Sequence, residues 1–166
     1  MTLLGSMDFR ERLQKAAERG KQARDTRLHE AAAKALSEEE CRRLHLQYRL
    51  ALTEHIEERL RELAENIPGF RFETIVNEEG WGAAVSRDDV GLAEGRRRNF
   101  FSRLQLVVSP FGKYHVLELV AKGTVRNKET FSRNHYQRLA EVDQESFREL
   151  AELWVLDYAE QFSAAA

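Results

Sequence analysis

Glu118 and His135 are the residues of this sequence whose chemistry best suits acid–base catalysis. Each lies in a segment of the predicted sheet, and pairing the two segments as adjacent strands makes them diagonal neighbours within reach of one substrate. A surface contact is the commoner role of such a pair, and neither a nucleophile nor a glycine-rich phosphate loop accompanies it. We therefore predict no catalytic residues and keep a small-molecule enzyme using this pair as the third functional hypothesis.

Basic and aromatic side chains are interleaved on the same predicted sheet face. Such surfaces bind single-stranded nucleic acid, with rings stacking on bases and Lys or Arg contacting phosphates. Many solvated sheet faces have the same composition, and the glycine-aromatic signature of RNA-binding sheets is missing, so nucleic-acid binding is the second hypothesis. The predicted ligand-binding residues are Phe101, Arg103, Gln105, Glu118, Lys122, Arg133 and His135.

Three consecutive arginines, Arg96, Arg97 and Arg98, end a segment that also holds two glycines, residues 88–98. This segment is long for a hairpin connection and predicts a functional or mobile loop. The arginines suit contact with phosphate or an acidic partner. They equally suit a solvated gatekeeper that precedes a hydrophobic strand, and the sequence leaves both interpretations open.

Cys41 and His45 lie one helical turn apart, a spacing that zinc ligands use. His55 is two or three turns further along and cannot reach the same ion. Two ligands are too few for a zinc site, so we predict neither a metal nor a cofactor. Cys41 is also the only cysteine, which excludes an internal disulfide and is compatible with a reducing compartment.

Residues 99–126 predict the central hairpin of a sheet, closed by a Pro-Phe-Gly turn. Pairing Val108 with His115 and Leu106 with Leu117 separates apolar from polar side chains, because neighbouring residues of a strand face opposite sides. The side chains predicted to be buried are Leu104, Leu106, Leu117, Leu119 and Ala121.

The strands on either side complete a five-stranded meander. Residues 70–87 predict a first hairpin, and residues 130–138 predict a polar edge strand after a turn at Asn127 and Lys128. Extending the register across that turn sets Lys122 opposite Arg133, Val120 opposite His135 and Glu118 opposite Gln137.

Helical patterns flank the strands. Residues 8–36 are charged and rich in alanine, with a thin apolar stripe and a possible break near Gly20 to Thr26. Ser37 and Glu40 form a capping-box signature that predicts the start of a second helix, and the cap allows a helical hairpin. That second helix carries a continuous apolar stripe as far as Ile67, and Asp143 is predicted to cap a last, apolar helix.

Length and composition fit one domain, or one domain with a helical appendage. The chain has 166 residues, of which 42% are hydrophobic, and a formal net charge of −2. We expect a cytoplasmic protein without a membrane span, since no uncharged run approaches about 20 residues. The terminal residues 1–6 and 164–166 resemble cloning remnants and are given no functional weight.

Together the patterns predict an α+β fold of two layers. A five-stranded antiparallel meander is packed on one face by a long helix from the N-terminal half and by the C-terminal helix, with an extra N-terminal helix. The predicted parts are the N-terminal helical segment, 8–36, and a single α+β domain, 37–163. Because the first helix has little apolar surface, the leading hypothesis is a non-enzymatic binding or protein-interaction module that self-associates or docks through its N-terminal helices.

Overall fold

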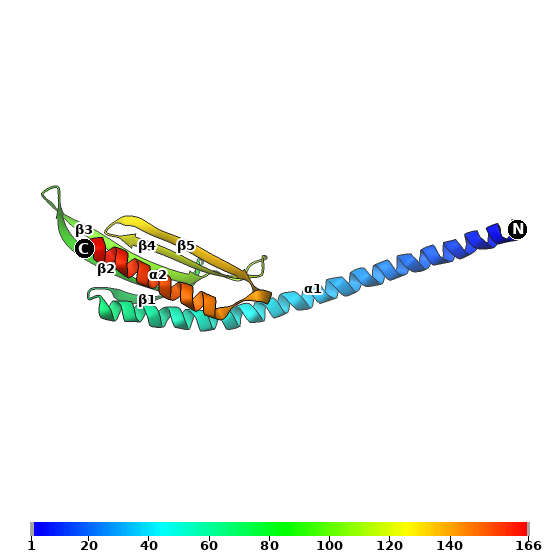
Figure 1. Ribbon diagram of the computed structural model, residues 1–166, viewed down its shortest axis with the longest axis horizontal. Helices are drawn as coiled ribbons and strands as arrows, with labels where there is room; N and C mark the ends of the chain where they lie inside the picture. Colours follow the sequence, from blue (N-terminus) through cyan, green and yellow to red (C-terminus); the bar gives the residue numbers. More distant parts are fainter. Residues whose placement is uncertain (1, 166) are drawn as a thin grey trace. The chain divides into compact units, whose positions relative to one another are not determined.

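The computed structural model describes the backbone of residues 2–165 and the side chains of residues 8–32 and 37–165. Its contacts divide the chain into two units, Met1–Glu40 and Cys41–Ala166. The order of elements is the predicted one, and the fold is α+β (Figure 1). The elements are α1 (Thr2–Asn66), β1 (Arg71–Asn77), β2 (Gly80–Ala93), β3 (Arg96–Val108), β4 (Val116–Val125), β5 (Lys128–Arg138), a short 3-10 helix (Leu139–Glu141) and α2 (Gln144–Ala165).

The two helical segments predicted ahead of the sheet are joined in α1. The helix passes through Gly20 without a break and continues through Ser37, so the predicted helix start after Ser37 is wrong. No glycine or proline separates Gly20 from Ser37 in the sequence, and the alanines between them favour the helical conformation. A capping-box signature begins a helix only where the residues before it leave that conformation.

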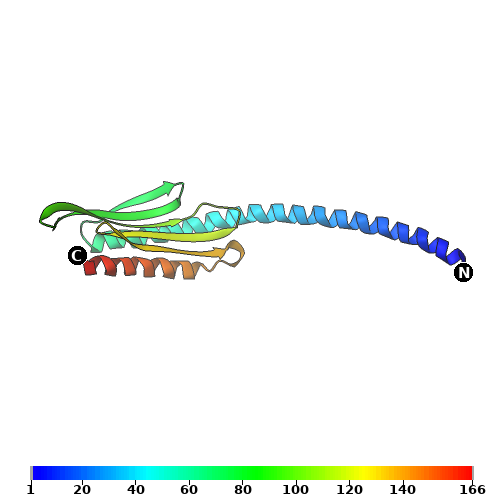
Figure 2. The same ribbon diagram turned by 90° about the horizontal axis from the view of Figure 1, so that it is seen from above.

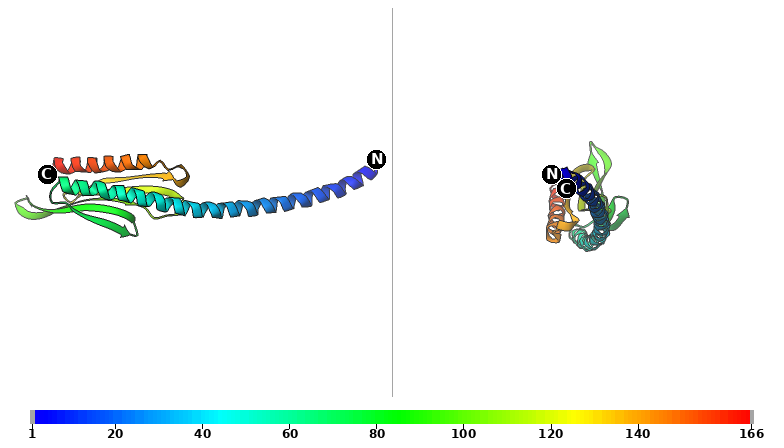
Figure 3. Two further views of the ribbon diagram at one scale, coloured as in Figure 1. Left: turned by 90° about the horizontal axis from the view of Figure 1, so that it is seen from below. Right: turned by 90° about the vertical axis from the view of Figure 1, so that its right-hand side faces the viewer.

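Residues 41–66 of α1 and the whole of α2 lie on one face of the sheet (Figure 2). The other views agree that, among residues 41–165, no helix lies on the opposite face (Figure 3). The apolar stripe predicted for α1 faces the sheet, with Ile56 and Leu60 fully buried, and α2 contributes Phe147 and Tyr158 to the same core. Burial of this shared stripe is the main stabilising contribution to the layer.

The sheet is a meander in the order β1-β2-β3-β4-β5, with every pair antiparallel. The faces of the central hairpin are as predicted, but its register differs by four residues: Val108 pairs with Leu119 and Leu106 with Ala121. Residues 109–115 form a longer connection than the predicted tight turn. An even shift leaves each side chain on its original face, so the five residues predicted to be buried are buried.

The predicted register of the last hairpin is wrong by one residue, and a shift of one residue moves side chains to the opposite face of the sheet. The turn lies at Arg126 and Asn127, both with positive φ, one position earlier than predicted. The earlier turn alone would change each pairing by two residues, and a bulge between Gly123 and Thr124 reverses one of them, which leaves a net shift of one. His135 consequently pairs with Leu119 instead of Val120.

Residues 88–98 do not form the predicted loop. They belong to the paired ends of β2 and β3, which close in a two-residue turn at Glu94 and Gly95 with φ of 57° and 73°. This ribbon, residues 88–101, is called the arm below, and it extends past the other strands (Figure 1). Asn127 holds its base, because its amide group donates to the Asn99 carbonyl (2.9 Å) and accepts from the Phe101 N–H (2.8 Å).

The helix ends are defined by the residues that the sequence marks. Pro68 and Gly69 follow α1, and Gly69 has a φ of 99°, which favours glycine. Asp143 caps α2 as predicted, because its side chain accepts a hydrogen bond from the Glu145 N–H at 3.2 Å.

Candidate functional site

The predicted acid–base pair is not assembled. Glu118 lies on the sheet face without helices, where it accepts a hydrogen bond from the Ser109 hydroxyl at 2.7 Å. His135 lies on the helix-covered face, with its ring centroid 5.0 Å from that of Phe147 in α2. The bulge before Thr124 separates the two side chains, so they cannot act on one substrate.

The predicted ligand-binding residues are likewise divided between the two faces. Arg133 pairs with Ala121 in the sheet, and its guanidinium lies 2.7 Å from the Asp157 carboxylate of α2. It belongs, with His135, to the packing of α2. The predicted residues that remain on the uncovered face are Phe101, Arg103, Gln105, Glu118 and Lys122.

Carboxylates oppose the cations of this uncovered face. Arg103 forms an ion pair with Glu73, and Glu79 lies 3.9 Å from the Lys122 ammonium and accepts a hydrogen bond from Gln105 at 2.9 Å. These acidic residues come from the first hairpin, and their position beside Arg103 and Lys122 is not predicted from the sequence. The pairs reduce the positive potential that a phosphate backbone requires.

The three arginines predicted as an anionic-partner contact lie near the tip of the arm. Arg96, Arg97 and Arg98 are exposed and form no ion pair with any residue described by the structure. They pair with Ala93, Leu92 and Gly91 of β2, so they alternate between the two faces of the ribbon. The structure therefore does not gather them into one three-arginine cradle.

The potential zinc ligands serve other contacts. His45 is 3% exposed, and its Nε2 lies 3.1 Å from the Ser109 carbonyl, to which the Nε2–H tautomer donates. Burial lowers the pKa of His45, with Arg49 lowering it further and the Ser109 carbonyl acting in the opposite direction. Within the described part of the chain, no three metal-ligating side chains form a group.

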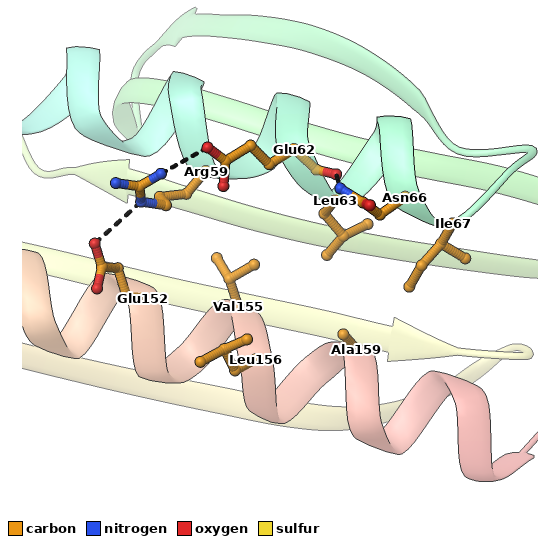
Figure 4. Close-up of a pocket in the computed structure, with 9 residues that line it drawn as sticks. All are labelled: Arg59, Glu62, Leu63, Asn66, Ile67, Glu152, Val155, Leu156 and Ala159. Atoms are coloured by element: carbon orange, nitrogen blue, oxygen red, sulfur yellow. Dashed lines mark hydrogen bonds and ion pairs between the residues drawn. The ribbon is translucent and has the colours of Figure 1, made fainter.

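An apolar groove lies between α1 and α2 in the helical layer. Its cavity volume is about 500 Å³. Leu63 and Ile67 extend from the end of α1 toward Val155, Leu156 and Ala159 of α2 (Figure 4). The groove, called the inter-helix groove below, is lined by Arg59, Glu62, Leu63, Asn66, Ile67, Glu152, Val155, Leu156 and Ala159.

One end of the inter-helix groove is polar. The Arg59 guanidinium donates to Glu62 at 2.8 Å and to Glu152 at 3.0 Å, and the bond to Glu152 is the main cause of a raised Arg59 pKa (Figure 4). His55 Nε2 is also 3.3 Å from Glu152 Oε1, but no hydrogen bond of acceptable geometry joins them. This network fixes the two helices at one end and leaves the apolar end open.

The sequence carries a signal for this groove, in addition to the core packing that the apolar stripe of α2 predicts. Leu156 broadens the apolar stripe of α2 beyond the width that a sheet-facing helix needs. In the structure it is 67% exposed and lines the groove, and Leu153 is also exposed. The excess width of the stripe therefore marks a second apolar surface.

Residues 8–32 of α1, called the N-terminal segment below, bury no described side chain. Its large apolar residues Phe9, Leu13 and Leu28 are 66%, 61% and 63% exposed. Asp8 and Arg12 form an ion pair of 2.8 Å, one turn apart on the helix surface. Such exposed pairs add only about 0.3 to 0.5 kcal/mol to a helix.

None of the described helices has the length and apolar character needed to span a membrane. No protein-family model, curated protein or solved structure matches this chain.

Proposed function

We propose that this protein is a non-enzymatic interaction module that self-associates or docks to another protein through the N-terminal segment. The observation that carries the proposal is the exposure of every described side chain from residue 8 to residue 32. Most helical stability in proteins comes from packing an apolar face, and isolated helices in water are marginal. A helical segment of this length with no buried side chain therefore gains stability from a partner.

The composition of the N-terminal segment supports the same proposal. Phe9 and Leu13 lie one turn apart, and small residues continue their stripe at Ala16, Gly20 and Ala23. A narrow stripe of this type suits one partner surface instead of burial on several sides. Exposed apolar groups at helical spacing are also the contacts by which helices dock in grooves.

The alternatives receive less support from the geometry. A small-molecule enzyme needs Glu118 and His135 together, and they lie on opposite faces of the sheet. Nucleic-acid binding on the sheet face requires exposed cations, whereas Arg103 and Lys122 are opposed by carboxylates. The exposed arginines of the arm suit contact with an acidic surface, which is separate from the proposed self-association.

The proposal is tested by comparing the full chain with a shortened chain that begins at Ser37. We expect the shortened chain to retain the sheet and one cooperative melting transition, because the core lies between Cys41 and Ala166. We expect it to lose self-association, measured as molecular mass by light scattering at matched concentrations. A full chain that is monomeric and binds no protein partner would contradict the proposal, as would unfolding of the shortened chain.

A further inference from the structure

The inter-helix groove has the dimensions of a short stretch of the N-terminal segment. Its lining runs from Arg59 to Asn66 on α1 and from Glu152 to Ala159 on α2. Each stretch rises about 10 Å at 1.5 Å per residue. Phe9 and Ala16 are also seven residues apart, so the part of the stripe with the largest apolar side chains matches the length of the groove.

The exposed leucine in the groove also needs an apolar helix face as its partner. Leu63 and Ile67 lie across from Leu156, which is 67% exposed (Figure 4). Burying an apolar side chain of this size is favourable relative to leaving it in water. A helix that presents Phe9 and Leu13 can cover these groups by inserting its apolar residues between α1 and α2.

The charges of the two surfaces are complementary. The N-terminal segment, residues 8–32, carries seven Lys or Arg and five Asp or Glu, a net charge of +2. The helices beside the groove have the opposite balance: residues 54–66 carry five acidic and two basic residues, and α2 carries five acidic residues and one arginine. A basic helix is therefore attracted to this layer, and opposite potentials favour that partner over an acidic one.

We infer that the inter-helix groove of one copy binds the N-terminal segment of a second copy, with Phe9, Leu13 and Ala16 against Leu63, Ile67 and Leu156. This inference rests on the proposed self-association and names its acceptor surface. Each copy has both the segment and the groove, so a reciprocal exchange closes a dimer with two-fold symmetry. The competing arrangement pairs the N-terminal segments of two copies directly and leaves both grooves empty.

Substitutions in the full chain distinguish the two arrangements. We expect Leu13→Glu and Leu156→Glu each to raise the dimer dissociation constant at least about tenfold, because either change puts a charge in an apolar contact. The matched controls are Gln14→Glu, which adds a charge in the same turn as Leu13, and Leu50→Glu, which replaces a leucine that is 57% exposed and lies outside the groove. Both controls should dimerise within about threefold of the unaltered chain.

Disulfide trapping gives a second measurement. In a Cys41→Ser background, Leu13→Cys chains are mixed with Leu156→Cys chains under mild oxidation, with Leu50→Cys as the control partner. The inference predicts that the Leu13–Leu156 heterodimer accumulates faster than either the Leu13–Leu13 homodimer or the control heterodimer. This readout does not depend on the stability of a charged variant.

The outcomes separate the inference from the proposed function. One set of results would overturn the groove inference and leave self-association intact. In it the full chain dimerises, Leu13→Glu weakens the dimer but Leu156→Glu does not, and the Leu13–Leu13 disulfide is the main trapped product. A full chain that is monomeric and gives no trapped dimer would overturn both. Loss of dimerisation in both glutamate variants together with the heterodisulfide supports the inference.

Discussion

His45 in α1 contacts a loop that lies about sixty residues later in the chain. The ring is buried, donates to the Ser109 carbonyl, and lies edge-on to Phe111 at a centroid distance of 5.6 Å. Arg42 lies over the same phenyl ring, 4.6 Å from its centroid. The connection between β3 and β4 is therefore held against α1 by aromatic packing and one hydrogen bond.

This environment makes part of the folding stability depend on pH. Burial holds the His45 pKa below its usual value of about 6.5, so the unfolded chain binds the proton at higher pH than the folded chain. The stability that depends on neutral His45 is present above about pH 6.5 and is lost as the pH falls toward the folded pKa. We expect the unfolding free energy, measured in urea at pH 7.5 and pH 5.5, to decrease on acidification.

The control for this prediction is His45→Gln, whose amide can donate to Ser109 and does not titrate. Its unfolding free energy should decrease less between the two pH values, because carboxylates and other histidines act equally in both proteins. Parallel pH dependence of the two chains would contradict the prediction.

Hydrophobic alternation predicted the faces of the central strands but could not determine their register. A shift by an even number of residues leaves the same side chains buried, and the apolar pattern of Leu104 and Leu106 matches several partners on β4. The actual register depends on contacts outside the hairpin, such as those of Ser109 and Phe111. The strand faces were therefore predictable, whereas the length of the connection was not.

The bulge before Thr124 explains why the candidate site was predicted incorrectly. Gly123 leaves room for Phe131 and Tyr158, since a Cβ at that position would lie 2.7 Å from the Phe131 Cβ. A glycine inside a strand is a signal for a bulge, but the sequence does not show which pairing it changes. One unpaired residue was enough to transfer Arg133 and His135 to the helix-covered face.

Substitutions at the neighbouring residues Leu119 and Val120 test the two faces of β4 separately. Leu119 is fully buried under the helices, and Val120 is half-buried on the face without them. We expect Leu119→Ala to lower the unfolding free energy by about 2 to 5 kcal/mol, because it leaves a cavity in the core. Val120→Ala should cost about 1 kcal/mol, since its surroundings can relax into solvent.

Urea denaturation of both variants, compared with the unaltered chain, gives these differences directly. Equal losses of unfolding free energy in the two variants would show that the helix-covered face of β4 is no more tightly packed than the face without helices. A loss below about 0.5 kcal/mol for Leu119→Ala would show that β4 is not central to the core.

At the scale of the whole molecule, the distribution of charge gives a prediction about assembly. The N-terminal segment is basic, whereas α2 is acidic. If these surfaces meet, their attraction is screened as ionic strength rises, with a Debye length of about 10 Å at 0.1 M and about 3 Å at 1 M. We expect the dimer dissociation constant to rise at least about tenfold between 0.05 M and 0.5 M sodium chloride.

Analytical ultracentrifugation at several salt concentrations measures this dependence. The double variant Arg10→Gln with Arg12→Gln should bind more weakly at low salt and show a shallower dependence. A dissociation constant that is unchanged or falls with salt would indicate that apolar contacts alone hold the copies together.

The order of the elements along the chain has a consequence for synthesis. Translation proceeds from the N-terminus, so residues 41–66 of α1 and all five strands leave the ribosome before α2. Until α2 arrives, the sheet face that contains Leu117 and Leu119 is covered by α1 alone. A nascent chain paused in this interval exposes apolar surface of the type that chaperones bind, and it completes its core only when Phe147 and Tyr158 have been added.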